Sequence, residues 1–176
     1  MKLGNPVREI RTIKALLEGA EEESRRAGET MPGVEHLLLA ALALPDGTAR
    51  RAFARIGVEP DDVRRAISSQ HTDALRAIGI TGVDDEILDA STLDAMAPAS
   101  GVFRATAPAQ AAFRASVDLA KSQTPSRLVG AHVVAVIAAM EHGTAARTIT
   151  ALGIDRHALA ASARLEFESS PVARTV

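Results

Sequence analysis

The segment GVEHLLLAALAL, residues 33–44, decides the fold. It is almost wholly apolar, it follows Pro32, and the sequence PDG at residues 45–47 ends it, so it predicts a short helix. A helix that is apolar on every face belongs in the centre of a bundle, because no side of it suits water. The sequence therefore predicts a helical protein built around this segment.

The chain repeats this segment once. Adding 96 to each residue number aligns residues 36–57 with residues 132–153 without a gap. Seven of these 22 positions are identical, and many others exchange one aliphatic residue for another. An internal duplication of this kind predicts two similar halves. The identical pairs are His36/His132, Ala43/Ala139, Gly47/Gly143, Thr48/Thr144, Ala49/Ala145, Arg51/Arg147 and Gly57/Gly153.

The composition favours tightly packed helices. Of the 176 residues 47% are hydrophobic but only 2% are aromatic, with no Trp or Tyr, so the core must consist mainly of Ala, Leu, Val and Ile. The small side chains allow helices to approach closely, and no segment shows the apolar/polar alternation of a strand. We expect an all-α fold of two pseudo-twofold-related repeats with about four helices each, packed as one bundle.

Charge and residue usage exclude several classes of function. The net charge of −2, from 20 basic and 22 acidic residues, predicts no binding to nucleic acid or to a membrane surface. The chain has no cysteine, and hence no disulfide, thiolate nucleophile or Cys-ligated zinc. It shows neither a signal peptide nor the roughly 20 apolar residues of a membrane span. We expect a cytoplasmic protein.

The expected organisation is one domain over residues 1–176. Its parts are a first repeat at 8–68, an extra helical or linker segment at 69–105, a second repeat at 106–167 and a frayed tail at 168–176. Within the linker, Asp73–Ile78 and Asp84–Leu88 predict short helical pieces, and the Ala-, Pro- and Ser-rich run Thr92–Ala105 predicts a connector.

Finer features follow from local signals. In the first helix, a core-facing stripe is expected from Ile10, Ile13, Leu17 and Ala20. Thr48 is expected to cap a third helix, and the fourth helix is expected to end near residue 69.

The residues resemble a known family at two places. The sequence AEEESRRAG at residues 20–28, followed by GVEHLLL at 33–39, resembles the first Clp repeat in the N-terminal domain of ClpA- and ClpC-type unfoldases. The sequence TAP at 106–108, together with LVGAH at 128–132 and GTAA at 143–146, resembles the second repeat. The resemblance covers most of residues 8–68 and 104–166. It implies a pseudo-twofold helical bundle that docks adaptors and substrates.

Some members of that family also bind phosphorylated arginine, once per repeat. The resemblance implies that a Glu before the repeat's His holds the guanidinium and that a Thr at the start of the first helix holds the phosphate. Glu35 matches the first-repeat Glu, but Ile10 stands where the Thr would be. Thr106 matches the second-repeat Thr, but Ala131 replaces the Glu. We therefore expect phosphoarginine binding to be weak or absent.

Each candidate binding residue also has a structural interpretation. Glu35 can stabilise its helix through the helix dipole, and Thr106 can serve as an N-cap. Leu17 and Phe113, at equivalent positions in the two halves, can line a peptide groove or simply pack in the core. His36 and His132 are expected to pack as neutral rings bonded to the preceding loop, not to bind a metal.

No motif indicates an enzyme. The chain has no Ser-His-Asp signature in a local frame and no G-x-x-x-x-G-K-[ST] loop, so no catalytic residue, cofactor or unfolding motor is expected. The leading hypothesis is a non-enzymatic module that binds proteins or peptides as an adaptor, decoy or regulator of a Clp protease system. The alternative is a helical regulatory or stress protein that acts through self-association, unrelated to proteolysis.

Overall fold

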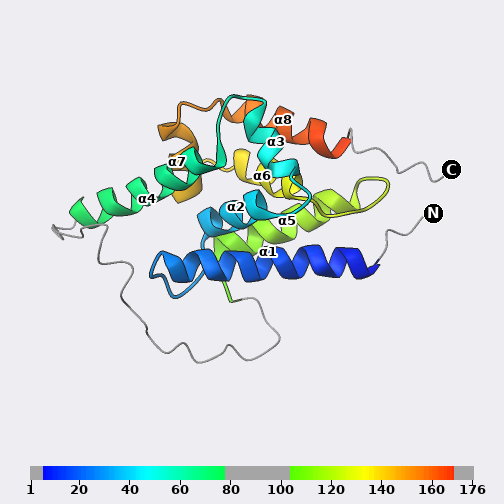
Figure 1. The fold of residues 1–176 in the computed structure, drawn as a ribbon, viewed down its shortest axis with the longest axis horizontal. Coiled ribbons are helices and arrows are strands. Elements are labelled where there is room, and N and C mark those ends of the chain that lie inside the picture. The colour runs from blue at the N-terminus through cyan, green and yellow to red at the C-terminus, as the bar shows by residue number, and fades with distance from the viewer. Residues whose placement is uncertain (1–5, 78–103, 169–176) are drawn as a thin grey trace.

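The computed structural model describes residues 6–77 and 104–168, which form eight helices and contain no strand (Figure 1). The predicted all-α class is therefore right. None of these helices is both long and apolar enough to cross a membrane. The helices are α1 (Pro6–Arg26), α2 (Val34–Ala43), α3 (Thr48–Ala54), α4 (Pro60–Ala77), α5 (Ala107–Lys121), α6 (Gly130–Ala138), α7 (Thr144–Ala151) and α8 (Arg156–Glu168).

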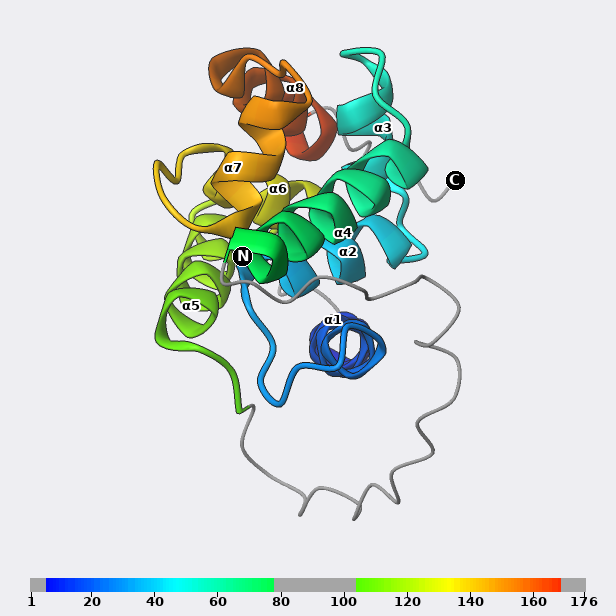
Figure 2. The same cartoon turned by 90° about the vertical axis from the view of Figure 1, so that its left-hand side faces the viewer.

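The helices form two sets of four in the same order, α1–α4 and α5–α8. Equivalent helices begin at equivalent residues, since α3 and α7 start at Thr48 and Thr144, and α4 and α8 start at Pro60 and Arg156. The sets interlock, because α3 packs against α8 while α4 packs against α7 (Figures 1 and 2). Such reciprocal packing is expected of two repeats related by a pseudo-twofold axis, and it confirms the predicted double-repeat fold.

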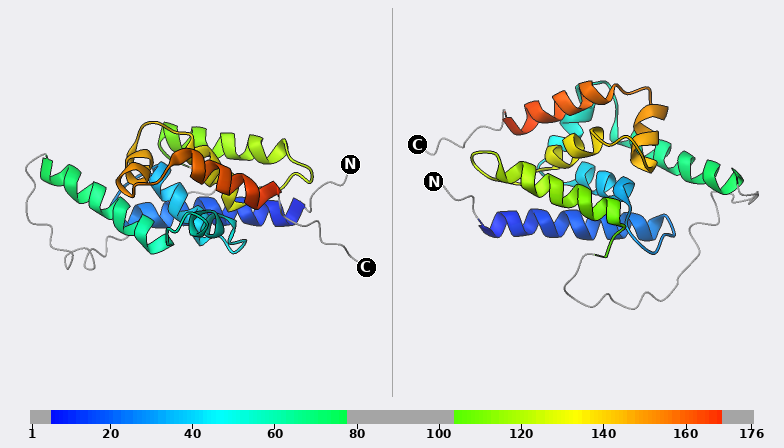
Figure 3. Two further views of the ribbon diagram at one scale, coloured as in Figure 1. Left: turned by 90° about the horizontal axis from the view of Figure 1, so that it is seen from above. Right: turned by 180° about the vertical axis from the view of Figure 1, so that it is seen from behind.

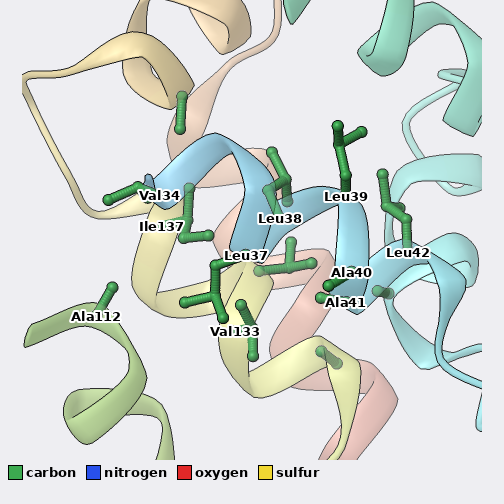
Figure 4. Packing of buried hydrophobic residues seen from close by; sticks show 14 of the residues in the cluster. Val34, Leu37, Leu38, Leu39, Ala40, Ala41, Leu42, Ala112, Val133 and Ile137 are labelled. Carbon is green, nitrogen blue, oxygen red and sulfur yellow. The ribbon is translucent and has the colours of Figure 1, made fainter. Parts of the chain in front are cut away.

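The core lies where α2 packs against α6. Every residue of α2 except Glu35 and Ala43 is buried, as its uniformly apolar sequence predicts. Figure 4 shows Leu37 of α2 beside Val133 and Ile137 of α6. Complete burial of such a side chain contributes about 1.5–3 kcal/mol, so the two apolar helices stabilise the bundle from its centre.

The buried stripe of α1 differs from the predicted one. Leu16 is 0% exposed, whereas Ile10 is 65% exposed and Leu17 is half-buried. Positions 16 and 17 both have helical spacing from Ile13 and Ala20, and packing against α2 selects Leu16. Ile10 faces solvent because the N-terminal turns of α1 extend past α2 (Figure 1).

α4 continues to Ala77, well beyond the end expected near residue 69. The predicted piece Asp73–Ile78 is thus part of α4 as far as Ala77. A polar run does not end a helix that projects from the bundle into solvent, as α4 does (Figure 3), and no Gly or Pro interrupts the run. The predicted piece Asp84–Leu88, most of the connector Thr92–Ala105 and the C-terminal tail lie outside the described residues.

Candidate functional site

The N-terminal end of α2 gathers polar groups from three segments. After α1 ends, the N–H of Glu29 donates to the carbonyl oxygen of Ser24 at 2.9 Å, and the Ser24 hydroxyl donates to the carbonyl oxygen of Glu29 at 3.0 Å. These two bonds fold the chain back beside the last turn of α1. The side chain of Glu29 consequently lies near the first turn of α2, which the sequence alone did not indicate.

Glu35 lies in that first turn with its carboxylate folded back over Gly33. A Cβ atom at position 33 would stand 2.1 Å from the Glu35 Oε1 atom, so a larger residue at this position would displace the Glu35 carboxylate from its place over the backbone. The Glu35 side chain is 13% exposed. Its position in the first turn of α2 also lets the carboxylate interact favourably with the helix dipole.

His36 and His132 have equivalent surroundings in the two repeats. Nδ1 of His36 accepts the N–H of Gly33 at 2.9 Å, and Nδ1 of His132 accepts the N–H of Val129 at 3.1 Å. Positions 33 and 129 are equivalent, and both imidazoles are almost fully buried. Each ring therefore accepts the N–H of the N-cap residue of its own helix from inside the protein, as the structural interpretation of these histidines predicts.

Glu29, Glu35 and His36 place one possible metal-ligand atom each within 4.8 Å of one another. The lone pair of His36 Nδ1 already accepts the N–H of Gly33, and a metal bound there would break that bond. The equivalent bond of His132 forms without neighbouring glutamates, so the orientation of the ring needs no ion. The orientation of the His36 ring is accounted for by helix capping.

Thr106 is the N-cap of α5. Its Oγ1 accepts the N–H of Ala109 at a long 3.4 Å, and its own N–H donates to the carbonyl oxygen of Pro32 at 3.0 Å. Pro32 lies three residues before Glu35, so the structure brings the N-termini of α2 and α5 together. Glu35 and Thr106, assigned from sequence to two separate sites, therefore lie at adjoining helix ends.

The N-terminus of α6 is occupied by side chains of the first repeat. Oδ2 of Asp46 accepts the N–H of Gly130 at 3.2 Å, and Oγ1 of Thr48 accepts the N–H of Ala131 at 2.8 Å. Thr48 thus caps α6 and not its own helix, whose N-cap is Gly47, which corrects the predicted role. Ala131 is 0% exposed. This helix end is closed from within the protein.

Close packing makes that closure possible. A Cβ atom at Gly130 would stand 2.8 Å from the carbonyl oxygen of Ala41 and 3.0 Å from the Cβ of Ala49. The backbone at the start of α6 therefore lies directly against the first repeat. The sequence signals this contact only through the spacing of Asp46 and Thr48. In a turn with this spacing, the Asp46 carboxylate accepts both the N–H and the hydroxyl of Thr48.

His132 is held neutral in this closed region. Burial lowers the pKa of His132 to about 4, because a charged ring would lose its water shell, and the carboxylate of Asp46 opposes the shift too weakly to reverse it. The ring stacks on Phe167 with 4.3 Å between centroids and 14° between planes. Its Nε2 has no hydrogen-bond partner. The site therefore favours the uncharged form.

Leu17 and Phe113 do not form one wall. Leu17 lies on α1, which packs against α2, and Phe113 lies on α5, which packs mainly against α6. Both side chains are half-buried, and of the two only Phe113 packs against the main apolar core. α1 and α5 make no extensive contact with each other. The structure thus places these two residues on separate helices and does not bring them together.

Two buried glutamates form ion pairs with arginines of α3 and α4. Glu166 of α8 accepts from Nε of Arg51 at 2.6 Å and from Nε of Arg55 at 2.8 Å, which joins the two repeats. Burial alone would raise the pKa of Glu166, but the hydrogen bonds and charges of the two arginines outweigh it and lower that pKa. Arg64 of α4 likewise binds both carboxylate oxygens of Glu23 on α1.

Comparisons with known proteins agree with this geometry. The family model described as the Clp repeat (R) N-terminal domain matches residues 11–82. The chloroplastic chaperone protein ClpC1 of Oryza sativa subsp. japonica is 33% identical over 66 residues, which are 38% of this chain. The chain spans 7% of the length of that relative.

A solved structure extends the similarity to both repeats. The N-terminal domain of the caseinolytic protease associated chaperone ClpD from Arabidopsis thaliana superposes with a TM-score of 0.54 at 20% identity. The match covers 92% of this chain and 92% of that one. At this identity the likeness concerns the fold, and it includes the second repeat, which lies outside residues 11–82.

Proposed function

From the premise that residues 11–82 carry a Clp repeat and that the described chain has the fold of a Clp N-terminal domain, we propose that this protein works by binding other proteins. It acts without chemistry of its own, as an adaptor, decoy or regulator of a Clp protease system. The observation that supports this most is the double-repeat fold itself, shared with a domain of a protease-associated chaperone.

The end of the molecule formed by the N-termini of α2 and α5 is the proposed contact region. Glu35 offers a carboxylate, Thr106 offers a hydroxyl, and Met31 beside them is an exposed apolar side chain at 43%. A carboxylate next to an exposed apolar side chain suits a basic or amide-rich segment of a partner. Leu17 and Phe113, on the neighbouring helices, are proposed as further contacts.

Affinity purification of the tagged full-length chain from extracts of its source tests the proposal. A Clp ATPase, a Clp protease subunit or known Clp substrates should be enriched over an untagged control, and the double variant Glu35→Ala/Thr106→Ala should reduce that enrichment. If the wild-type chain enriches none of these proteins, the proposed role in a Clp system is wrong.

Light scattering after size exclusion separates the proposal from self-association. A monomer that recruits Clp components supports the adaptor, decoy or regulator role. A stable dimer without any Clp component would instead favour a helical regulatory or stress protein unrelated to proteolysis.

A further inference from the structure

A groove opens on the first repeat beside the C-terminal half of α2. It has a volume of about 300 Å³ and lies between α2, α3 and the first turns of α4. Leu39, Leu42 and Ala43 of α2 form an apolar floor with Pro60 of α4. Figure 4 shows Leu39 and Leu42 projecting from the side of α2 opposite Leu37. A volume of this size accommodates a few aliphatic side chains.

The second repeat has no counterpart to this groove. The positions equivalent to Leu39, Leu42, Arg50 and Arg64 are all alanines: Ala135, Ala138, Ala146 and Ala160. These small residues let α8 pack closely along α6, whereas α4 contacts α2 less and leans on α7.

A hydrogen bond closes the equivalent space further. Arg156, which stands where the first repeat has Pro60, donates from Nη1 to the carbonyl oxygen of Met140 at 2.7 Å. The groove is therefore a feature of one repeat and not a consequence of the shared fold.

The mouth of the groove carries one uncompensated cation. Arg64 is neutralised by Glu23, whereas Arg50 has no carboxylate partner among the described residues and makes one long hydrogen bond, 3.5 Å to the carbonyl oxygen of Leu44. An arginine with a free edge suits a carboxylate, which it can bind through two nitrogens. Asp61 on the opposite wall repels a second acidic group. These charges therefore favour a ligand with a single acidic side chain, placed next to Arg50 of α3.

We propose that this groove docks a short protein segment in which one acidic side chain is flanked by aliphatic side chains. The aliphatic side chains occupy the floor over Leu39, Leu42 and Pro60, and the acidic one pairs with Arg50. This inference rests on the proposed function, since a docking groove has a role in a protein that binds other proteins. It adds a second contact region and the chemistry of its ligand.

An array of octapeptides probed with the full-length chain tests the groove. The peptides carry aliphatic residues on both sides of a central Glu, Gln or Lys. Wild type should bind the Glu-centred peptides at least about tenfold more tightly than the Lys-centred ones, a difference of about 1.4 kcal/mol. The Arg50→Glu variant should reverse this preference, whereas Arg114→Glu, on the exposed side of α5, should keep it.

A second variant blocks the groove without altering the core. Ala43 is exposed at the groove, so Ala43→Gln should fill it and weaken binding of every peptide about tenfold or more. The matched control is Ala139→Gln, the equivalent exposed position of the second repeat, which should bind as wild type does.

The outcomes separate the two proposals. If Arg50→Glu and Ala43→Gln leave peptide binding unchanged, or if wild type binds no peptide yet still recruits Clp components, the groove proposal is wrong and the proposed function stands. If wild type neither binds a peptide nor recruits a Clp component, both are wrong.

Discussion

The N-termini of α2 and α6 occupy equivalent places in the two repeats, yet they meet different neighbours. At α6, Asp46 and Thr48 accept the first amides and Ala131 is fully buried. At α2, Glu35 is partly exposed and adjoins the N-terminus of α5 through the bond from Thr106 to Pro32. One helix end is closed by the protein, and the other is accessible to a partner.

The same contrast recurs at the fourth helix of each repeat. α8 lies close against α6 over alanines, while α4 stands off from α2 over leucines and leaves a groove. Both accessible features belong to the first repeat, which is also the part that the family model matches. The duplication thus supplies a symmetric scaffold, while the differences between the repeats create the two surfaces that we propose for binding.

The largest expected effect comes from forcing the closed helix end to resemble the open one. Ala131→Glu would bury a carboxylate beside Asp46 in a site with no room for it, at a cost on the order of 3–5 kcal/mol. Chemical denaturation should show this loss, or the variant should fail to fold. Ala139→Glu, at the exposed C-cap of the same helix, should lose little. A stable Ala131→Glu variant would contradict the closed end.

A smaller effect is expected from acid, through the neutral His132. An unfolded histidine binds its proton near pH 6.5, whereas His132 in the folded protein does so near pH 4, so stability is complete above pH 6.5 and falls as the pH is lowered toward 4. Between pH 6.5 and 5, before carboxylates titrate, the loss should be about 2 kcal/mol.

Urea denaturation over a pH series measures this dependence. The variant His132→Gln should lose most of the slope between pH 6.5 and 5, although its stability at pH 7 falls. His157→Gln, exposed on α8, should keep the slope of wild type. A slope that survives in His132→Gln would show that another group carries it.

The ion pairs between the repeats account for the next largest expected effect. Glu166 joins α8 to α3 through its ion pairs with Arg51 and Arg55. Glu166→Gln should cost about 1–2 kcal/mol, because both arginines are half-exposed and water replaces part of the lost contact. Thermal unfolding measures this cost, with Glu168→Gln as the control. Equal stabilities of the wild type and Glu166→Gln would contradict the role of Glu166.

Capping of α5 should contribute less. Thr106→Ala removes a long N-cap bond and is expected to cost about 0.5–1 kcal/mol, which corresponds to a fall in Tm of roughly 1–4 °C for a chain of this size. Thr150→Ala, on the exposed side of α7, should leave Tm nearly unchanged. A fall of Tm well above this range would show that Thr106 has a further structural role.

The smallest expected signal is that of phosphoarginine. The α6 end has no carboxylate at Ala131 and its amides are already bonded, and at the α2 end Ile10 replaces the threonine of the family pattern. Calorimetric titration should show no binding tighter than roughly millimolar, which corresponds to about −4 kcal/mol. Tight binding of one equivalent that is abolished by Glu35→Gln would assign phosphoarginine to the N-terminus of α2. Binding of two equivalents would contradict the difference between the N-termini of α2 and α6.

The amino-acid sequence by itself determined the helical class, the duplication, the central place of the two apolar helices and the capping by His36 and His132. These features depend on interactions within a few turns, which periodicity and spacing report directly. The extent of each helix was less accessible, because the polar residues before Ala77 end a helix in some settings and extend it into solvent in others.

The tertiary structure alone decided which of two equivalent positions faces the core and which chain segment caps which helix. Leu16 and not Leu17 is buried because α2 lies on that side, and Thr48 bonds Ala131 because the fold brings the two repeats into contact. The groove opens for the same reason, since its width depends on how far Leu39 and Leu42 hold α4 from α2. Such choices depend on partners tens of residues away, about which local pattern carries no information.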